Sequence, residues 1–294
     1  MNRMLKWAGY GLAGVAATAV VVAGGAMAAS QVMFRGPVVK PAVRMAAATD
    51  AQAAARGYRI ATVHGCVDCH GGNLQGRMFD DIPHVARLYA PNLTLAVAKQ
   101  SDADLDRAIR HGVRADGRPL WVMPSSTFAH LTDGETADLI AYLRTLRPAG
   151  APQPQSQLGP VGRIGILIGQ FKSEPTIIRA HENPALPDLG PQYAKGRDVA
   201  RACVECHGPA LKGGDGVLKT PDLTVAAAYD LPDFECLLRT GVAAGGREVG
   251  LMSASSRIRF GALTSDEITA LHEYLKARAA SVVAAAETKP LPKS

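Results

Sequence analysis

Residues 66–70 read CVDCH, and residues 203–207 read CVECH. Each motif places two thiols three positions apart, with a histidine directly after the second thiol. Two thiols at this spacing can add across the vinyl groups of a haem, and the adjacent imidazole then lies beneath the iron. The repeated motif therefore predicts two covalently attached c-type haems. The predicted attachment residues and first iron ligands are Cys66, Cys69, His70, Cys203, Cys206 and His207.

The chain also repeats itself outside these motifs. Residues 90–94 (APNLT) match residues 220–224 (TPDLT), and residues 128–143 match residues 260–275. The matched segments keep their order, and their separation varies by only a few residues. This pattern is typical of a duplicated domain with small loop changes. A chain of 294 residues is long enough for two domains of ordinary size.

Each half is predicted to be helical. The last helix of each half begins at a threonine, Thr132 or Thr264, with a glutamate three residues later, which is the capping-box pattern. No convincing strand pattern occurs, so the predicted fold class is all-α. The other predicted helices precede and follow the motifs, over residues 51–65, 192–202, 102–112 and 231–241.

The chain begins with a long apolar segment. Arg3 and Lys6 are followed by residues 7–34, which carry no charge. This length suits a transmembrane helix and exceeds the apolar core of a signal peptide. We expect an anchor in the bacterial inner membrane, with the rest of the chain on the periplasmic side. The alternatives are a soluble periplasmic protein after signal cleavage at AMA, residues 26–28, or a buried soluble helix.

Two other chemistries use a CxxC pair. Two pairs could form one four-thiolate zinc site, and a single pair could act as a redox dithiol. Neither chemistry needs a histidine after each pair, and export disfavours persistent free thiols. Covalent haem attachment is therefore the preferred interpretation.

A methionine precedes the last helix of each half. Met123 lies in WVMPSS and Met252 in GLMSAS, at matching positions. A thioether is a good ligand for haem iron and raises its reduction potential. We therefore predict Met123 and Met252 as the second iron ligands. Met78 has no partner in the second half and is expected in a loop or in packing, and Met45 is expected in a linker.

One cysteine lies outside the duplicated pattern. Cys236 aligns with Arg107, and a thiolate ligand would lower the potential of a haem iron. The preferred interpretation is a buried helix thiol beside Leu237 and Leu238. The remaining histidines have no matches between the halves and are not expected to be ligands: His64, His84, His111, His130, His181 and His272.

The bulk composition limits the partners. The formal net charge of +6 suits acidic partners or anionic lipid. The 32 Lys and Arg residues are spread along the chain without a basic run or interleaved aromatic residues, so a nucleic-acid partner is not expected.

The predicted layout has six parts. The apolar run IGILIGQF, residues 164–171, is too short to be a second membrane segment and is expected to pack against one of the domains. The parts are a membrane anchor or signal segment (1–35), a linker (36–49), a first domain (50–148), a linker rich in Pro and Gly (149–186), a second domain (187–280) and a tail (281–294).

Each half resembles a class I cytochrome c domain. The CxxCH motif, the PNL-type segment, the methionine and the final helix occur in that family's order, over roughly residues 50–148 and 187–280. The whole chain resembles membrane-anchored dihaem c-type cytochromes, including cytochrome subunits of bacterial periplasmic dehydrogenases. In such domains a proline carbonyl accepts the ring N–H of the ligating histidine. The resemblance implies this role for Pro91 and Pro221, with a simple turn as the alternative.

Three further residues have two open interpretations each. Arg110 and Arg239 match each other near helix ends, where they could pair with haem propionates or with the helix C-terminus. Trp121 could cover a haem edge or belong to the core.

The resemblance implies an electron-transfer protein rather than an enzyme. With both irons bound by histidine and methionine, no position remains for a substrate. The expected partners are a periplasmic dehydrogenase, a quinol enzyme or a terminal oxidase. The alternatives are a dihaem enzyme, such as a thiosulfate dehydrogenase or a peroxidase-like protein, and a redox or gas sensor. Each of these needs a haem with a different or labile second ligand.

Overall fold

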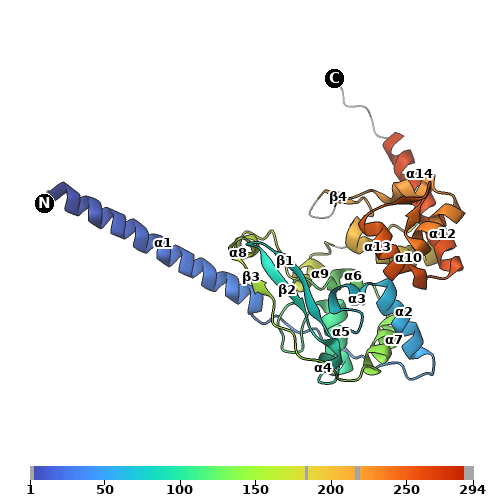
Figure 1. Ribbon diagram of the computed structural model, residues 1–294, viewed down its shortest axis with the longest axis horizontal. Coiled ribbons are helices and arrows are strands. Elements are labelled where there is room, and N and C mark those ends of the chain that lie inside the picture. Colours follow the sequence, from blue (N-terminus) through green and yellow to red (C-terminus); the bar gives the residue numbers. More distant parts are fainter. Residues whose placement is uncertain (1–2, 183–184, 216–218, 288–294) are drawn as a thin grey trace.

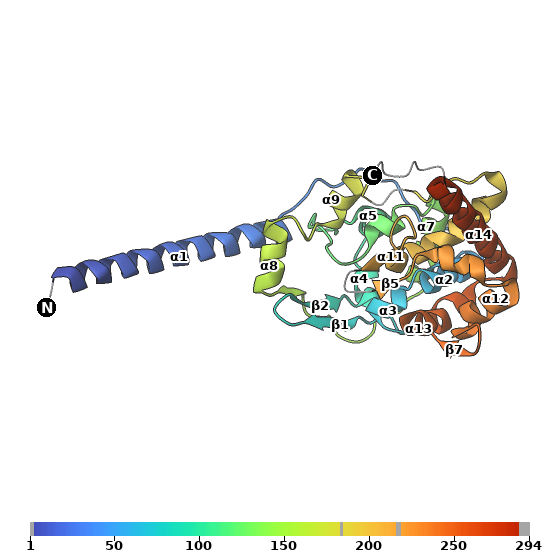
Figure 2. The same ribbon diagram turned by 90° about the horizontal axis from the view of Figure 1, so that it is seen from above.

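The computed structural model describes residues 3–182, 185–215 and 219–287. A long helix, α1 (Arg3–Arg35), extends away from a globular part that contains the other elements (Figures 1 and 2). Residues Tyr10–Arg35 of α1 are long and apolar enough to cross a membrane, and none of their apolar window is buried in the protein. An apolar N-terminal helix is therefore present, as the sequence predicts.

The first half is built around two packed helices, α2 and α7. The predicted capping box at Thr132 is confirmed, because its side chain accepts from the Glu135 amide while Glu135 accepts from the Thr132 amide. The elements are α2 (Ala53–Val63), α3 (Cys66–His70), β1 (Arg77–Ile82), β2 (Ala86–Ala90), α4 (Leu93–Val97), α5 (Asp102–His111), α6 (Ser125–Phe128) and α7 (Asp133–Arg144).

The all-α prediction is wrong for the segment between His70 and Pro91. Residues 77–82 and 86–90 form an antiparallel hairpin, and β3 (Gln157–Leu158) pairs with β2 to give a three-stranded sheet. The sequence hides β1 because its register slips at a bulge between Met78 and Asp80 and no face is consistently buried. Met78 itself is 47% exposed on this strand.

The second half repeats the helical arrangement. The capping box at Thr264 also forms, with Glu267 as its partner. The elements are η1 (Pro191–Tyr193), α10 (Ala194–Ala200), η2 (Arg201–Cys203), α11 (Val204–His207), η3 (Leu223–Ala228), α12 (Leu231–Thr240), α13 (Leu251–Ile258), η4 (Phe260–Ala262) and α14 (Ser265–Glu287), with the paired short strands β4 (Gly214–Asp215), β5 (Lys219–Thr220), β6 (Val242–Ala243) and β7 (Arg247–Glu248).

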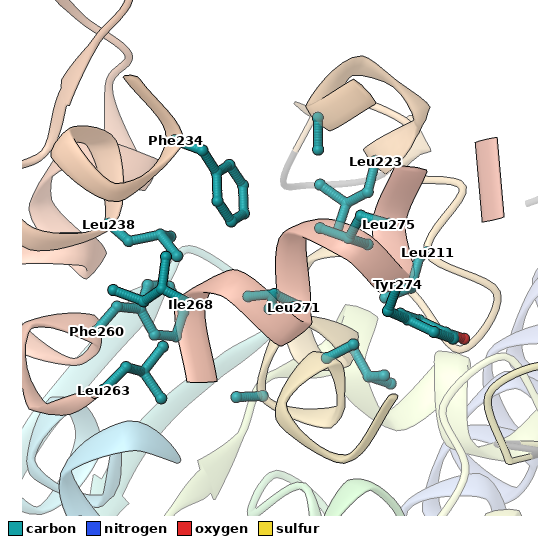
Figure 3. Packing of buried hydrophobic residues seen from close by; sticks show 14 of the residues in the cluster. Leu211, Leu223, Phe234, Leu238, Phe260, Leu263, Ile268, Leu271, Tyr274 and Leu275 are labelled. Atoms are coloured by element: carbon teal, nitrogen blue, oxygen red, sulfur yellow. The ribbon is translucent and has the colours of Figure 1, made fainter. Parts of the chain in front are cut away.

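Two hydrophobic cores lie in the described part of the chain. In the core of the second half, Leu271, Tyr274 and Leu275 of α14 lie among side chains from the other elements of that half (Figure 3). The first core is formed by Ala61, Leu74, Val97, Leu105, Ile109, Phe128, Leu131, Leu139, Ile140 and Leu143. Each half therefore has a hydrophobic core of its own.

A glycine marks the same helix crossing in each half. A Cβ on Gly57 of α2 would lie 2.0 Å from the Asp138 carbonyl oxygen of α7, and a Cβ on Gly196 of α10 would lie 2.0 Å from the Ala270 carbonyl oxygen of α14. Only glycine permits so close an approach of two backbones. The duplication therefore extends to the packing of the first and last helices.

The segments outside the two halves are more structured than the sequence suggests. Met45, expected in a linker, packs against the first core, and the Ala47 amide donates to the Asp102 carboxylate at 2.8 Å. The second linker contains α8 (Pro160–Leu167) and α9 (Glu174–Arg179). The first residues of the expected tail continue α14 to Glu287, whereas residues 288–294 lie outside the described ranges, as does Gly216 of the second glycine-rich loop.

The two halves exchange ion pairs through their capping-box glutamates. Arg59 of the first half donates to Glu267 at 2.6 Å, and Arg201 of the second half donates to Glu135 at 3.3 Å. Val63 of α2 also joins the second core. The halves therefore pack against each other through both charged and apolar contacts.

Candidate haem-binding sites

Each CxxCH motif lies at a short helix that ends at its histidine. His70 closes α3 and His207 closes α11, and both side chains are buried. The Nδ1 atom of His70 lies 2.9 Å from the Pro91 carbonyl oxygen, and that of His207 lies 2.9 Å from the Pro221 carbonyl oxygen. A carbonyl oxygen only accepts, so Nδ1 donates its hydrogen, and a neutral ring then keeps the lone pair of Nε2 for a metal. These are the contacts that the resemblance implies for Pro91 and Pro221.

Burial favours the neutral form of the His70 ring. Burial lowers the pKa of this imidazole, and the bond to the Pro91 carbonyl opposes the change only in part. A neutral imidazole is the form that binds a metal ion. The donor set in the first half, two thiols and a neutral ring with a free nitrogen, therefore fits a covalently attached haem.

The loop after each histidine has the same backbone structure in both halves. The Leu93 amide donates to the Leu74 carbonyl at 2.8 Å, and the Leu223 amide donates to the Leu211 carbonyl at 2.9 Å. Leu74 and Leu211 have positive φ values of 55° and 56° and are fully buried. This strained conformation is held by the packing of the leucine side chains. The signal in the sequence was the matched Leu-x-Gly in GGNLQGR and GPALKGGDG.

The thiols of the motifs lie in poorly solvated surroundings. Burial raises the pKa of Cys66 and of Cys203 to about 12, and it also raises the pKa of Cys69 and Cys206. A redox dithiol needs a thiol that ionises readily, so these surroundings argue against dithiol chemistry.

A shared zinc site is not supported either. Within residues 3–182, 185–215 and 219–287, no three His, Cys, Asp or Glu side chains are grouped so that they could hold a metal ion. The structure therefore does not bring the two CxxC pairs together as a four-thiolate site.

Each candidate methionine lies against the same core as its CxxCH motif. Met123 and Cys66 pack against the first core, and Met252 and Cys203 pack against the second. The thioether and the thiol of each predicted site are therefore in the same half and beside the same apolar residues, which is compatible with one haem in each half.

A buried glutamate from the second linker holds the loop of Met123. Glu174, at the start of α9, accepts from the Ser126 amide at 2.6 Å, and its own amide donates to the Leu120 carbonyl at 2.9 Å. Burial raises the pKa of Glu174, while the bonds from Ser126 lower it. A single glutamate in a linker carries no local signal, so the sequence alone does not point to this residue.

The loop of Met252 is held differently. Its support is Ser253, whose hydroxyl accepts from the Val249 amide at 2.8 Å and donates to the Gly241 carbonyl. Met252 itself lies in the first turn of α13. The two methionines therefore have different local support, although their positions in the repeat match.

Arg110 and Arg239 both lie in the last turn of their helices, which is one of the two positions expected for them. Each also connects its helix to the last helix of its half. Arg110 donates to Asp106 and Asp133, at 2.5 and 2.7 Å, and joins α5 to the start of α7. Arg239 joins α12 to α14 in the same way, through Glu235 at 2.8 Å and Ser265 at 2.9 Å.

Trp121 packs against the C-terminal end of α1. Its indole N–H donates to the Phe34 carbonyl at 3.0 Å, and the two rings are 5.7 Å apart. It therefore connects the loop of Met123 to the last turn of the long N-terminal helix.

The prediction of a buried Cys236 is wrong. Leu237 and Leu238 are buried, but the side chain of Cys236 is exposed on α12 and lies 3.5 Å from the Thr240 hydroxyl. At 100° per residue, a helix can bury two adjacent leucines and still turn the preceding residue outward. An exposed thiol on this face is not placed to ligate a buried iron.

Two hollows in the surface lie away from the candidate ligands. One, of about 430 Å³, lies between the halves beside His130, Arg201 and Val204. The other, of about 790 Å³, lies beside Tyr193, His272 and Lys276. Neither lining includes a cysteine or histidine of the motifs or either candidate methionine.

Comparison with known proteins gives a family for the first half. The family model described as cytochrome c matches residues 54–147. The chain is also similar to the fructose dehydrogenase cytochrome subunit of Gluconobacter japonicus, with 28% identity over 265 residues that cover 79% of this chain and 53% of the relative.

Two further relatives are similar over shorter stretches. The diheme cytochrome c-type protein of Cereibacter sphaeroides is 30% identical over 53% of this chain and 57% of its own length. The cytochrome c subunit of the quinone alcohol dehydrogenase of Gluconacetobacter polyoxogenes is 28% identical over 52% of this chain and 35% of its own length. The chain thus spans between 35 and 57% of the length of these three relatives. The matched family, together with the helix that ends at His70, identifies a cytochrome c domain in this chain.

Proposed function

We propose that this chain is a dihaem c-type cytochrome that passes single electrons as the cytochrome subunit of a periplasmic dehydrogenase complex. The observation that carries the proposal is the repeated histidine–proline contact. His207 and Pro221 lie outside the matched family range, yet they have the same 2.9 Å contact as His70 and Pro91. This repeat supports a second haem site and a second domain, with the boundaries 50–148 and 187–280.

The proposed residue roles follow from these contacts. Cys66, Cys69, Cys203 and Cys206 would tether the haems. Pro91 and Pro221 would orient the rings of His70 and His207, while Met123 and Met252 would supply the second ligands. A bound haem supplies one-electron chemistry through its iron. With both ligand positions taken, neither site leaves room for a substrate, so electron transfer is favoured over catalysis.

The proposed location and partners rest on α1 and on the relatives. Helix α1 would anchor the chain in the inner membrane, with both halves on the periplasmic side. Two of the similar proteins are named as cytochrome subunits of a fructose and an alcohol dehydrogenase. A dehydrogenase as the electron donor fits this pattern, with a quinol enzyme or a terminal oxidase as the next partner.

The test is a haem count combined with a redox titration of the purified protein. We expect two covalent haems with histidine–methionine spectra, and the loss of one haem in each of the variants C66A and C203A. The matched control is C236S, which should keep both haems because that thiol is exposed. Retention of two haems in C66A, or a thiolate spectrum lost in C236S, would contradict the proposed function.

A further inference from the structure

Helix α8 leaves an unpartnered apolar face. Its residues Val161, Ile164 and Ile168 are 50, 57 and 68% exposed. They recur at spacings of three and four residues, so they lie on one face of the helix, which Ile168 continues at the C-terminal end. Phe171, just beyond, is 41% exposed. The opposite face contacts the hairpin of the first half, where a Cβ on Gly162 would lie 2.2 Å from the Val85 carbonyl oxygen.

Helix α8 lies beside the end of the apolar helix α1. Arg163 of α8 donates to the Ser30 hydroxyl at 3.2 Å and to the Gln31 side chain at 3.1 Å. Figure 2 shows α8 crossing the C-terminal end of α1 at the side of the globular part that α1 enters. A helix that crosses the end of a membrane span lies in the plane of the membrane surface.

We propose that the exposed face of α8 lies on the surface of the lipid bilayer that α1 crosses. The proposal rests on the proposed retention of α1 as an anchor. No acidic residue occurs before Asp50 or within residues 157–173, whereas Arg35 and Arg163 lie at the junction of the two helices. A short helix with apolar residues on one face and basic residues nearby is suited to an interface that contains anionic lipid. The first half is then held against the membrane by two helices.

The test uses the full-length holoprotein in liposomes of phosphatidylcholine and phosphatidylglycerol. A spin label is placed at I168C in the C236S background, and its collision rates with oxygen and with a water-soluble nickel complex are measured. The matched control is V225C, because Val225 is an apolar residue of the second half that is 47% exposed. We expect the label at residue 168 to favour oxygen and the label at residue 225 to favour nickel.

Two results would overturn this inference. A label at residue 168 that meets nickel as often as the control would place α8 in water, and a label shielded from both reagents would place it against protein. Flotation of the liposomes gives a separate readout of the anchor. Protein that does not float with the lipid refutes both the anchor and the α8 contact, whereas protein that floats with a water-exposed label refutes the α8 contact alone.

A second inference rests on different residues. Arg259, directly after α13, donates to the Asp68 carboxylate at 2.6 Å and to the Glu205 carboxylate at 2.8 Å. Asp68 and Glu205 are the third residues of the two CxxCH motifs. The side chain of Arg259 is 8% exposed, and a Cβ on Gly65 would lie 2.2 Å from its guanidinium carbon. One buried cation therefore contacts both motifs.

The Asp68 carboxylate depends on this contact. Its other oxygen is buried without a hydrogen-bond partner, so Arg259 is the cation paired with this carboxylate within the described residues. Removal of one partner from a buried ion pair leaves an uncompensated charge. The contact therefore couples the charge balance at the first motif to a residue of the second half.

We infer that Arg259 is a positioning residue that fixes the two haem-attachment motifs relative to each other and sets the charge beside both motifs. The inference rests on the proposed dihaem function. A nearby cation disfavours the oxidised, more positive state of an iron centre, so its loss lowers the reduction potential. Because Arg259 contacts both motifs, its loss is expected to affect both haems.

The test is a redox titration of R259Q, with R278Q as the matched control. Arg278 is also buried but pairs with Asp222, within the second half. We expect R259Q to shift both midpoint potentials in the negative direction, R278Q to shift one, and R259K to stay closer to the unsubstituted protein because it keeps the charge.

The haem count separates this inference from the proposed function. Two haems with only one potential shifted in R259Q, or with neither shifted, would overturn the role of Arg259. A single haem in the unsubstituted protein would refute the dihaem function itself. If R259Q does not fold, R259K decides, because the ammonium of lysine on its flexible stem lacks the rigid fork of the guanidinium and holds the two carboxylates less firmly. In R259K the two halves are then expected to move more relative to each other. Electron paramagnetic resonance should show this as a broader distribution of haem–haem distances, and an unchanged distribution would contradict the inference.

Discussion

At the residue scale, the matched leucines that follow the motifs have an unusual backbone conformation. Leu74 has a φ of 55° and is 1% exposed, and Leu211 has nearly the same conformation. A left-handed conformation costs a side-chain-bearing residue about 1–2 kcal/mol, whereas burial of a leucine contributes about 1.5–3 kcal/mol. Burial therefore outweighs the strain.

This balance predicts that alanine at position 74 gives a less stable protein than glycine, which is the reverse of the usual order. L74G and L74A both lose the buried side chain, but L74A also keeps the strain. We expect L74A to be the less stable variant by about 1 kcal/mol. At Leu105, a buried position within α5, the ordinary order should hold, with L105G less stable than L105A. Urea unfolding of the four holoproteins measures these differences, and the same order at both sites would contradict the explanation.

A second prediction at this scale concerns pH. Burial lowers the pKa of His64 from 6.5 to about 4, with Arg201 adding to the shift and Glu135 opposing it. Between these two pH values the unfolded chain holds a proton that the folded chain does not, so stability falls as the pH falls. We expect wild-type protein to lose up to about 1.4 kcal/mol per pH unit relative to H64F over this range. Urea unfolding of both proteins at pH 7, 6 and 5 measures this, and a free energy of unfolding that changes equally with pH in wild-type protein and H64F would contradict the prediction.

At the element scale, the crossing of the first and last helices defines each half. Substitution of Gly57 or Gly196 by alanine pushes a methyl group to 2.0 Å from a carbonyl oxygen, so the helices must separate. We expect G57A and G196A each to destabilise the protein by about 1–3 kcal/mol. In G134A, a glycine of α7 with open space around it, alanine should instead be neutral or stabilising. Thermal unfolding that ranks G134A with the other two would refute this account.

Whether a helix or strand can be predicted from the sequence depends on whether the residues that stabilise it are close together along the chain. The helices that begin at Thr132 and Thr264 were predicted from a local capping pattern, which acts within one turn. The hairpin at 77–90 was missed because its pairing depends on contacts between exposed residues and on β3, which is far away in the chain.

At the scale of the whole molecule, the most extended element is α1, which is long and apolar enough to cross a membrane. It runs from Arg3 to Arg35 as one helix, through the predicted cleavage site at 26–28, and its last turns contact α8 and Trp121. We expect protein extracted from membranes to keep residues 1–35 and to resist release by high salt. The intact mass of the purified holoprotein measures this, and an N-terminus that begins just after residue 28 would show a cleaved signal instead.

The sequence by itself determined most of the helices, and it predicts the chemistry of the two candidate sites. The CxxCH motifs, the matched Met123 and Met252 and the capping boxes all act over short distances along the chain, so a short stretch of sequence contains the full pattern of each. Only the tertiary structure decided how the halves meet. The contacts of Arg259 with Asp68, of Arg59 with Glu267 and of Glu174 with Ser126 join residues from 48 to 208 positions apart. Such pairs depend on how whole helices pack, and no local pattern in the sequence encodes them.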